Sequence, residues 1–148
     1  MVYGKVSSQY KRSGIETAGK LDLIIMCYER AILLLEQVKD HIKEKEVERK
    51  AHKVKKVLDI ISELQGCLDM EKGGQIAKNL DSLYSYMTKR LLIGDIKKDL
   101  TSYDESIKIL SELKEAWVAI KSDEDRQEDV YVNRDMPKPE TSRIAATY

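Results

Sequence analysis

The sequence LQGCLDMEKGGQIAKNLDSLYSYMTKRL, residues 64–91, joins two amphipathic segments through a turn that contains two adjacent glycines. Before the turn, residues 57–68 are apolar on nearly all sides of a helix. After it, apolar side chains recur at steps of four, three, four and four residues, the spacing of one helix face: Ile76, Leu80, Leu83, Met87 and Leu91. We therefore expect two helices, with Asp69 capping the second. The glycine pair suggests that another backbone passes close by.

A long helix precedes this stretch. Apolar residues between Ile24 and Ile42 follow one another at steps of three and four, and Thr17 is the expected N-cap. Many further apolar residues lie outside that seam, so other helices must contact this helix on two or more sides.

Turn signals divide the chain into four helices. Residues 43–46 lack any apolar side chain and should hold a turn, and Gly94 followed by Asp95 predicts a tight connection to a last helix. The apolar pattern of that helix stops after Ser122. Four helices of about 20–25 residues with short turns predict an all-α, antiparallel up-down-up-down bundle over residues 1–121.

The composition agrees with one helical domain. Of the 148 residues, 42% are hydrophobic and 35% charged, with two prolines and no phenylalanine, which is typical of long amphipathic helices. The net charge is zero, so nothing favours binding to nucleic acid or to an anionic membrane. The longest nearly apolar run, Leu23–Tyr28, is too short for membrane insertion, and no signal peptide is visible. We expect a cytoplasmic protein in which Cys27 and Cys67 are buried thiols.

The two ends of the chain do not follow the helical pattern. Residues 1–16 are polar with isolated apolar side chains, among them Tyr10 and Ile15, and we expect a mobile arm. Residues 122–148 are acidic and then contain both prolines, and we expect an extended or disordered tail. Its one apolar cluster, residues 130–132, is able to lie on a surface of the bundle.

No pattern in the sequence indicates catalysis. His41 and His52 are interpreted as solvated side chains, and the carboxylates alternate with lysines at helix-pairing spacings. The pair Gly73–Gly74 follows no strand and lacks the GK[ST] of a phosphate loop. We therefore expect neither an enzyme nor a protein with a metal or cofactor.

The chain has more apolar residues than four bundle seams use. A bundle helix needs only about three apolar positions per heptad, and the first three predicted helices exceed that number. A well-filled core accounts for most of these residues. The excess predicts a groove that accepts an amphipathic partner helix.

Three segments resemble a known family, the flagellin-specific export chaperones of the FliS family. The first comprises Tyr10, Ile15-Glu16-Thr17-Ala18 and Ile25-Met26-Cys27-Tyr28-Glu29. The second is the run ISELQGCLDMEKGGQIAKNLDSLYSYMTKRL, residues 61–91, and the third is LSELKEAW, residues 110–117. The resemblance covers roughly residues 3–121. Where the family commonly has Thr-Ala-Ser-Pro before its first helix, this chain has Thr17-Ala18-Gly19-Lys20.

The resemblance implies a cytoplasmic four-helix bundle that is not an enzyme. It also implies binding of the disordered C-terminal segment of flagellin, which folds on the bundle, and delivery to the flagellar type III export gate, with contacts to other flagellar proteins possible in principle. Tyr10 and Ile15 match the arm that shields the family's groove. We expect the groove on the first three helices, lined by Leu23, Met26, Cys27, Ile60, Ile61, Leu64, Leu68, Leu83, Tyr84, Tyr86 and Met87.

Two other interpretations remain open at this point. The bundle could be a scaffold that self-associates through the same apolar surface, or a chaperone for another exported flagellar subunit. Alternatively, the tail could act as an internal pseudo-ligand that lays residues 130–132 or Ile144 over the groove.

Overall fold

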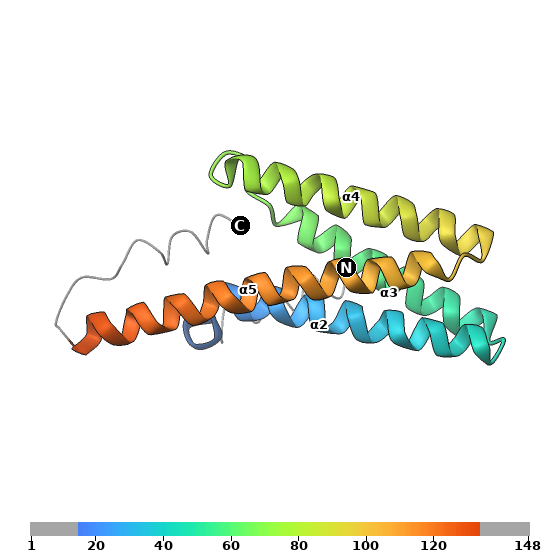
Figure 1. Ribbon diagram of the computed structural model, residues 1–148, viewed down its shortest axis with the longest axis horizontal. Helices are drawn as coiled ribbons and strands as arrows, with labels where there is room; N and C mark the ends of the chain where they lie inside the picture. The colour runs from blue at the N-terminus through green and yellow to red at the C-terminus, as the bar shows by residue number, and fades with distance from the viewer. Residues whose placement is uncertain (1–14, 134–148) are drawn as a thin grey trace.

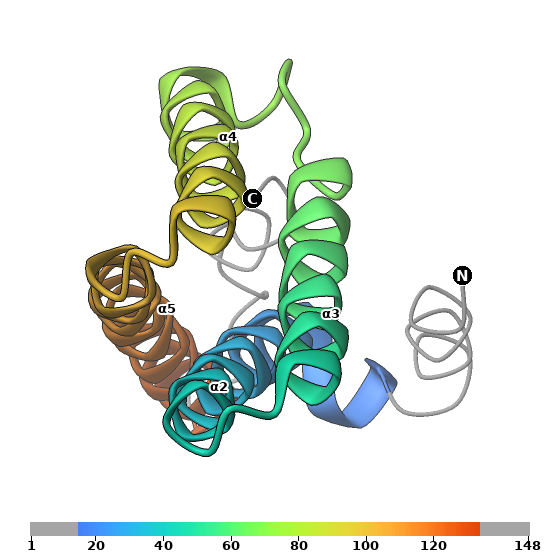
Figure 2. The same ribbon diagram turned by 90° about the vertical axis from the view of Figure 1, so that its right-hand side faces the viewer.

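The computed structural model describes residues 15–133, with side chains described for residues 19–126. Its helices are α2 (Ile15–Lys43), α3 (Val47–Gly66), α4 (Gly74–Lys97) and α5 (Thr101–Asn133). Each helix runs back along the one before it (Figure 1). Seen from one end, α4 lies between α3 and α5, and α2 closes the ring (Figure 2). The predicted all-α, up-down-up-down bundle is confirmed.

The core is centred on α2. This helix packs extensively on α3 and on α5, whereas α4 contacts its two neighbours less. The side chains without exposed area include Tyr28, Leu35, Ile61, Met87 and Leu110, which come from all four helices. The expectation that the first helix is contacted on more than one side is therefore confirmed.

The start of α2 differs from the prediction. The helix begins at Ile15, before the expected cap Thr17, and breaks at Gly19, whose φ of 75° and ψ of 164° are non-helical. Residues with side chains almost never adopt this conformation, so glycine is needed for the kink.

The turn between α3 and α4 also differs. Asp69 caps the turn itself: its Oδ1 accepts hydrogen bonds from the N–H groups of Glu71 at 3.1 Å and Lys72 at 3.0 Å. The helix begins later, at Gly74, so the predicted cap was wrong. A side chain on Gly74 would meet nothing within 4 Å among the described residues, so no other described segment of this chain passes close to it, and a close approach by a partner's backbone stays a prediction. Gly74 has a φ of +53°, a backbone conformation that glycine adopts far more readily than other residues do, and this conformation explains why a glycine stands at the position.

The turn between α4 and α5 lies four residues later in the sequence than predicted, because Gly94 was expected to end the helix and Lys98 ends it instead. The helix continues through Lys97 and ends at Lys98 in the left-handed conformation. The cap predicted for Asp95 belongs to Asp99, whose Oδ1 accepts the N–H of Thr101 at 3.0 Å. Gly94 lies inside α4, where an added Cβ would stand 2.0 Å from Oγ of Ser102. The glycine therefore permits close packing and does not end the helix.

The last helix is longer than predicted. It continues past Ser122 to Asn133 and extends beyond the ends of α3 and α4 (Figure 1). Residues 122–133 were expected to be extended or disordered, and that expectation was wrong for this part of the tail. This segment contains neither glycine nor proline, and it extends a helix that has already formed, which is easier than starting a new one. The expectations for residues 1–14, including Tyr10, and for residues 134–148 lie outside the described residues.

Two residues that the sequence predicted to be buried lie at the surface. Ile76 was assigned to the apolar stripe of α4 and is exposed, because it lies near the start of that helix. In α4, Ala77 and Tyr84 belong to the buried face, although neither was in the predicted stripe. Cys67 was expected to be buried, but it follows the last turn of α3 and is exposed.

Candidate binding surface

Three buried aromatic side chains connect α2, α4 and α5 by hydrogen bonds. The hydroxyls of Tyr28 and Tyr84 are hydrogen-bonded to each other, and Nε1 of Trp117 donates to the Tyr28 hydroxyl at 3.0 Å. Burial raises the pKa of Tyr28 and that of Tyr84 above the ordinary tyrosine value. Both phenols therefore stay neutral, and the network satisfies polar groups that would otherwise be costly to bury.

Polar contacts hold both edges of α4. Toward α3, Nε2 of Gln65 donates to Oδ1 of Asp81 and to Oγ of Ser85, at 2.8 Å each. Closer to the end of α4, Nζ of Lys50 lies 2.6 Å from Oδ1 of Asp95. The same carboxylate oxygen accepts the Tyr103 hydroxyl of α5 at 3.0 Å. Asp95, predicted as a helix cap, therefore connects three helices.

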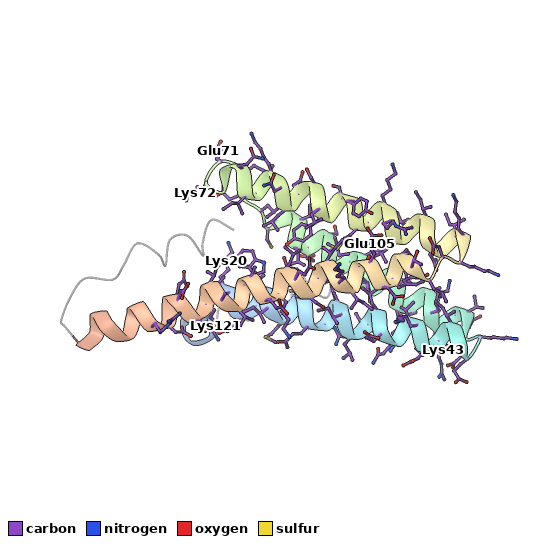
Figure 3. The ribbon with its side chains drawn as sticks, viewed as in Figure 1. Lys20, Lys43, Glu71, Lys72, Glu105 and Lys121 are labelled. Atoms are coloured by element: carbon purple, nitrogen blue, oxygen red, sulfur yellow. The ribbon has the colours of Figure 1, made fainter. Side chains whose placement is uncertain are left out.

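Arg90 of α4 pairs with two carboxylates at the start of α5. Its Nε lies 2.9 Å from Oε2 of Glu105 and its Nη1 lies 3.2 Å from Oδ2 of Asp99. Glu105, labelled in Figure 3, also accepts a hydrogen bond from the Tyr86 hydroxyl. The hydrogen bonds from Tyr86 and Arg90 lower the pKa of Glu105. Those from Thr101 and Arg90 lower the pKa of Asp99.

The structure divides the predicted groove residues into three groups. Two are exposed, Met26 at 53% and Tyr86 at 45%. Four are half-buried: Leu23, Cys27, Leu68 and Leu83. The remaining five lie in the core: Ile60, Ile61, Leu64, Tyr84 and Met87. The groove itself stays a prediction, and the five core residues are not accessible to a partner in this packing of the bundle. The side chain of Ile15 lies outside the described ones.

Sequence reasoning missed a set of exposed apolar residues near the end of α4. Leu92, Ile93 and Ile96 lie on the side of the helix opposite its buried residues, and Ile96 is 81% exposed. A hollow of about 390 Å³ adjoins them, lined by Gln65, Ser85, Thr88, Lys89, Leu92 and Ile93. The helical spacing of Leu92, Ile93 and Ile96 would have indicated a second apolar face on this helix.

The histidines do not form a ligand site. Nδ1 of His41 lies 3.2 Å from Oε1 of Glu46, and His52 is exposed. Within residues 19–126, whose side chains the structure describes, no group of three or more His, Cys, Asp or Glu side chains could hold a metal ion. Nor does any described helix have an apolar stretch of the length needed to cross a bilayer.

Comparisons with known proteins agree on one family. The family described as Flagellar protein FliS matches residues 3–124. The Flagellar secretion chaperone FliS of Vibrio cholerae is 37% identical over 115 residues, which cover 78% of this chain and 82% of that protein. The protein of the same name from Salmonella typhimurium is 34% identical over 119 residues, 80% of this chain and 86% of the relative. The Flagellar secretion chaperone FliSB of Pseudomonas aeruginosa is 32% identical over 120 residues, 78% and 95% respectively.

The matched region includes the three segments in which the sequence resembles the family, and it includes all four helices apart from the end of α5. The chain therefore belongs to the FliS family, a family of flagellar secretion chaperones and not of enzymes.

Proposed function

We propose that this protein is a cytoplasmic export chaperone that binds the C-terminal segment of flagellin. In this role it prevents premature polymerisation of flagellin and helps to deliver it to the flagellar type III secretion apparatus. The observation that carries the proposal is the match of residues 3–124 to a family of flagellar secretion chaperones.

The exposed and half-buried members of the predicted groove support an extended contact. Leu23, Met26 and Cys27 lie on α2, and Leu83 and Tyr86 lie on α4, so the apolar side chains are spread over several helices. A disordered segment that folds on binding must offset its ordering entropy with a large contact area. A surface distributed in this way suits an amphipathic helix better than a single pocket would. Tyr10 and Ile15 are proposed to shield it in the free protein.

Titration calorimetry with a peptide from the C-terminal segment of flagellin tests the proposal. We expect heat of binding together with a gain in helicity by circular dichroism, since the peptide orders on the bundle. Absence of both signals would reject flagellin as the partner. A protein that instead dimerises tightly would support the alternative of a self-associating scaffold or a chaperone for another flagellar subunit.

Substitutions at exposed positions locate the contact without disturbing the core. Met26→Asp should weaken peptide binding at least tenfold, which corresponds to about 1.4 kcal/mol. Val118→Asp on α5 is the matched control, because Val118 is 42% exposed, close to the 53% of Met26, and lies outside the predicted groove. Ile61 and Leu64 are unsuitable for this test, since a buried aspartate would unfold the bundle. Equal loss of binding in both variants would contradict the predicted groove.

A further inference from the structure

The α4 outer face combines apolar and basic side chains. We use this name for Leu92, Ile93 and Ile96 with Lys89 and Lys97. All five are exposed, and positions 89, 93 and 97 follow one another at helical steps of four. Among the described residues, Lys89, Lys97 and the neighbouring Lys98 form no ion pair. An exposed patch of this composition fits a partner that is helical and acidic.

The same chain provides a helix of that chemistry at its other end. The α5 extension, residues 122–133, contains five carboxylates and a single basic side chain, together with Val130, Tyr131 and Val132. Lys121 pairs with Asp22 at 2.5 Å and holds α5 against α2 just before the extension begins (Figure 3). Beyond that ion pair, the side chains of Asp123, Asp125 and Arg126 are exposed.

The extension cannot reach the α4 outer face of its own molecule. That face lies beside the start of α5, since Arg90 of α4 pairs with Asp99 and Glu105. With a rise of 1.5 Å per residue, residue 123 lies about 33 Å along the helix from residue 101. Any contact between the two regions must therefore involve two molecules.

The lysines of the α4 outer face and the carboxylates of the α5 extension determine which surfaces of two molecules can meet. Two α4 outer faces packed against each other would bring lysines together, and like charges at an interface are unfavourable. We therefore propose that the acidic α5 extension of one molecule binds the α4 outer face of a second copy. The contact is head-to-tail and does not close into a symmetric dimer, so it produces open oligomers that contain different numbers of molecules. It is separate from the binding of flagellin and does not depend on it.

Sedimentation of the full-length protein over a range of concentrations tests this inference. The weight-average mass should rise with concentration without a plateau at the dimer, with a dissociation constant on the order of 0.1 mM, as expected for a small polar interface. Because the contact is largely electrostatic, 0.5 M salt should suppress it. A protein that stays monomeric throughout, or a dimer insensitive to salt, would overturn the proposal.

Charge reversals on the two sides make the test specific. The variant Lys89→Glu/Lys97→Glu and the variant Asp125→Lys/Glu128→Lys should each lose self-association, and a mixture of the two should regain it as a cross-association. The control Lys72→Glu/Lys108→Glu changes the net charge as much as the first variant does. Both lysines are exposed and lie outside the α4 outer face, Lys72 in the turn before α4 (Figure 3) and Lys108 on α5. Loss of association in this control, or no recovery in the mixture, would reject the proposed contact.

Discussion

At the level of single residues, the junction between α4 and α5 depends on the absence of a side chain at Gly94. A Cβ there would stand 2.0 Å from Oγ and 2.4 Å from Cβ of Ser102, which is fully buried. Overpacking of this kind costs about 1–3 kcal/mol, and the better helix propensity of alanine offsets up to about 1 kcal/mol. Gly94→Ala should therefore lower the free energy of unfolding by about 1–2 kcal/mol, measured by urea denaturation.

Two further variants distinguish this cause from a general effect of replacing glycine. Gly66→Ala, in the last turn of α3, meets nothing within 4 Å and should leave stability unchanged or slightly raised. Ser102→Gly removes the atoms that clash, so it should restore part of the stability when combined with Gly94→Ala. If Gly66→Ala destabilised the protein equally, the packing explanation would be wrong.

The buried aromatic network marks a limit of prediction at this scale. Helical spacing indicates that Tyr28 and Trp117 face the core, and both are buried. Their hydrogen bond joins residues 89 apart in the sequence, and the bond from Tyr28 to Tyr84 joins residues 56 apart. Such pairings depend on the rotation of each helix about its axis, which periodicity alone does not determine. Tyr84 was accordingly assigned to the groove and lies in the core.

At the level of elements, the sequence predicted the helices themselves well and their ends poorly. Long periodic segments determine that a helix forms, but its first and last turns depend on local hydrogen bonds. Asp69 is of a residue type that often caps a helix, but here it caps the turn, and α4 begins later, at Gly74 with its positive φ. Gly94 is of the type that often ends a helix, but here the helix ends at Lys98, which takes the left-handed conformation. The α5 extension was missed because it has no periodic apolar face to detect.

Helix α4 should be the least protected of the four in hydrogen exchange. It contacts its neighbours less than any other helix does, and partly buried ion pairs make several of its contacts. Helices with few buried apolar contacts open locally at lower free energy than the rest of a domain. Exchange measured by mass spectrometry should therefore be faster in α4 than in α2. Equal protection of the two helices would show that α4 opens only when the whole bundle unfolds.

The variant Tyr84→Phe tests the role of the aromatic network in holding α4. It removes the hydroxyl that bonds Tyr28 but leaves the bond from Trp117 to Tyr28 in place. Loss of one hydrogen bond costs about 0.5–1.5 kcal/mol, so exchange in α4 should become about two- to tenfold faster. Exchange in α2 serves as the internal control and should change less. A uniform change across the four helices would indicate global destabilisation instead.

At the level of the whole molecule, the location of the binding surface could not be predicted from the sequence. Apolar residues in the core and apolar residues that face a partner satisfy the same periodicity. They differ only in whether neighbouring helices cover them: Met87 on α4 is fully buried, whereas Met26 on α2 is 53% exposed. The family match indicates a flagellar secretion chaperone, and burial separates the predicted groove residues that are exposed from those that lie in the core.

The pairing of α4 with α5 also makes stability depend on pH in a defined direction. The pKa values of Glu105 and Asp99 are lowered, the first mainly by the Tyr86 and Arg90 hydrogen bonds and the second mainly by those from Thr101 and Arg90. A carboxylate with a depressed folded-state pKa stabilises the protein fully above its unfolded value, and this contribution is lost as the pH falls through the folded value. For these residues the unfolded values are 4.5 and 3.8.

These two groups should therefore leave the free energy of unfolding unchanged between pH 7 and pH 6 and lower it at more acidic pH. Arg90→Met removes the guanidinium shared by both carboxylates, so the variant should be less stable than the wild type at pH 7. The difference between the two proteins should then shrink as the pH approaches 3, because protonated carboxyls gain little from arginine. Urea denaturation at a series of pH values measures both curves. A difference that stayed constant down to pH 3 would mean that Arg90 stabilises the bundle by packing and not by its charge.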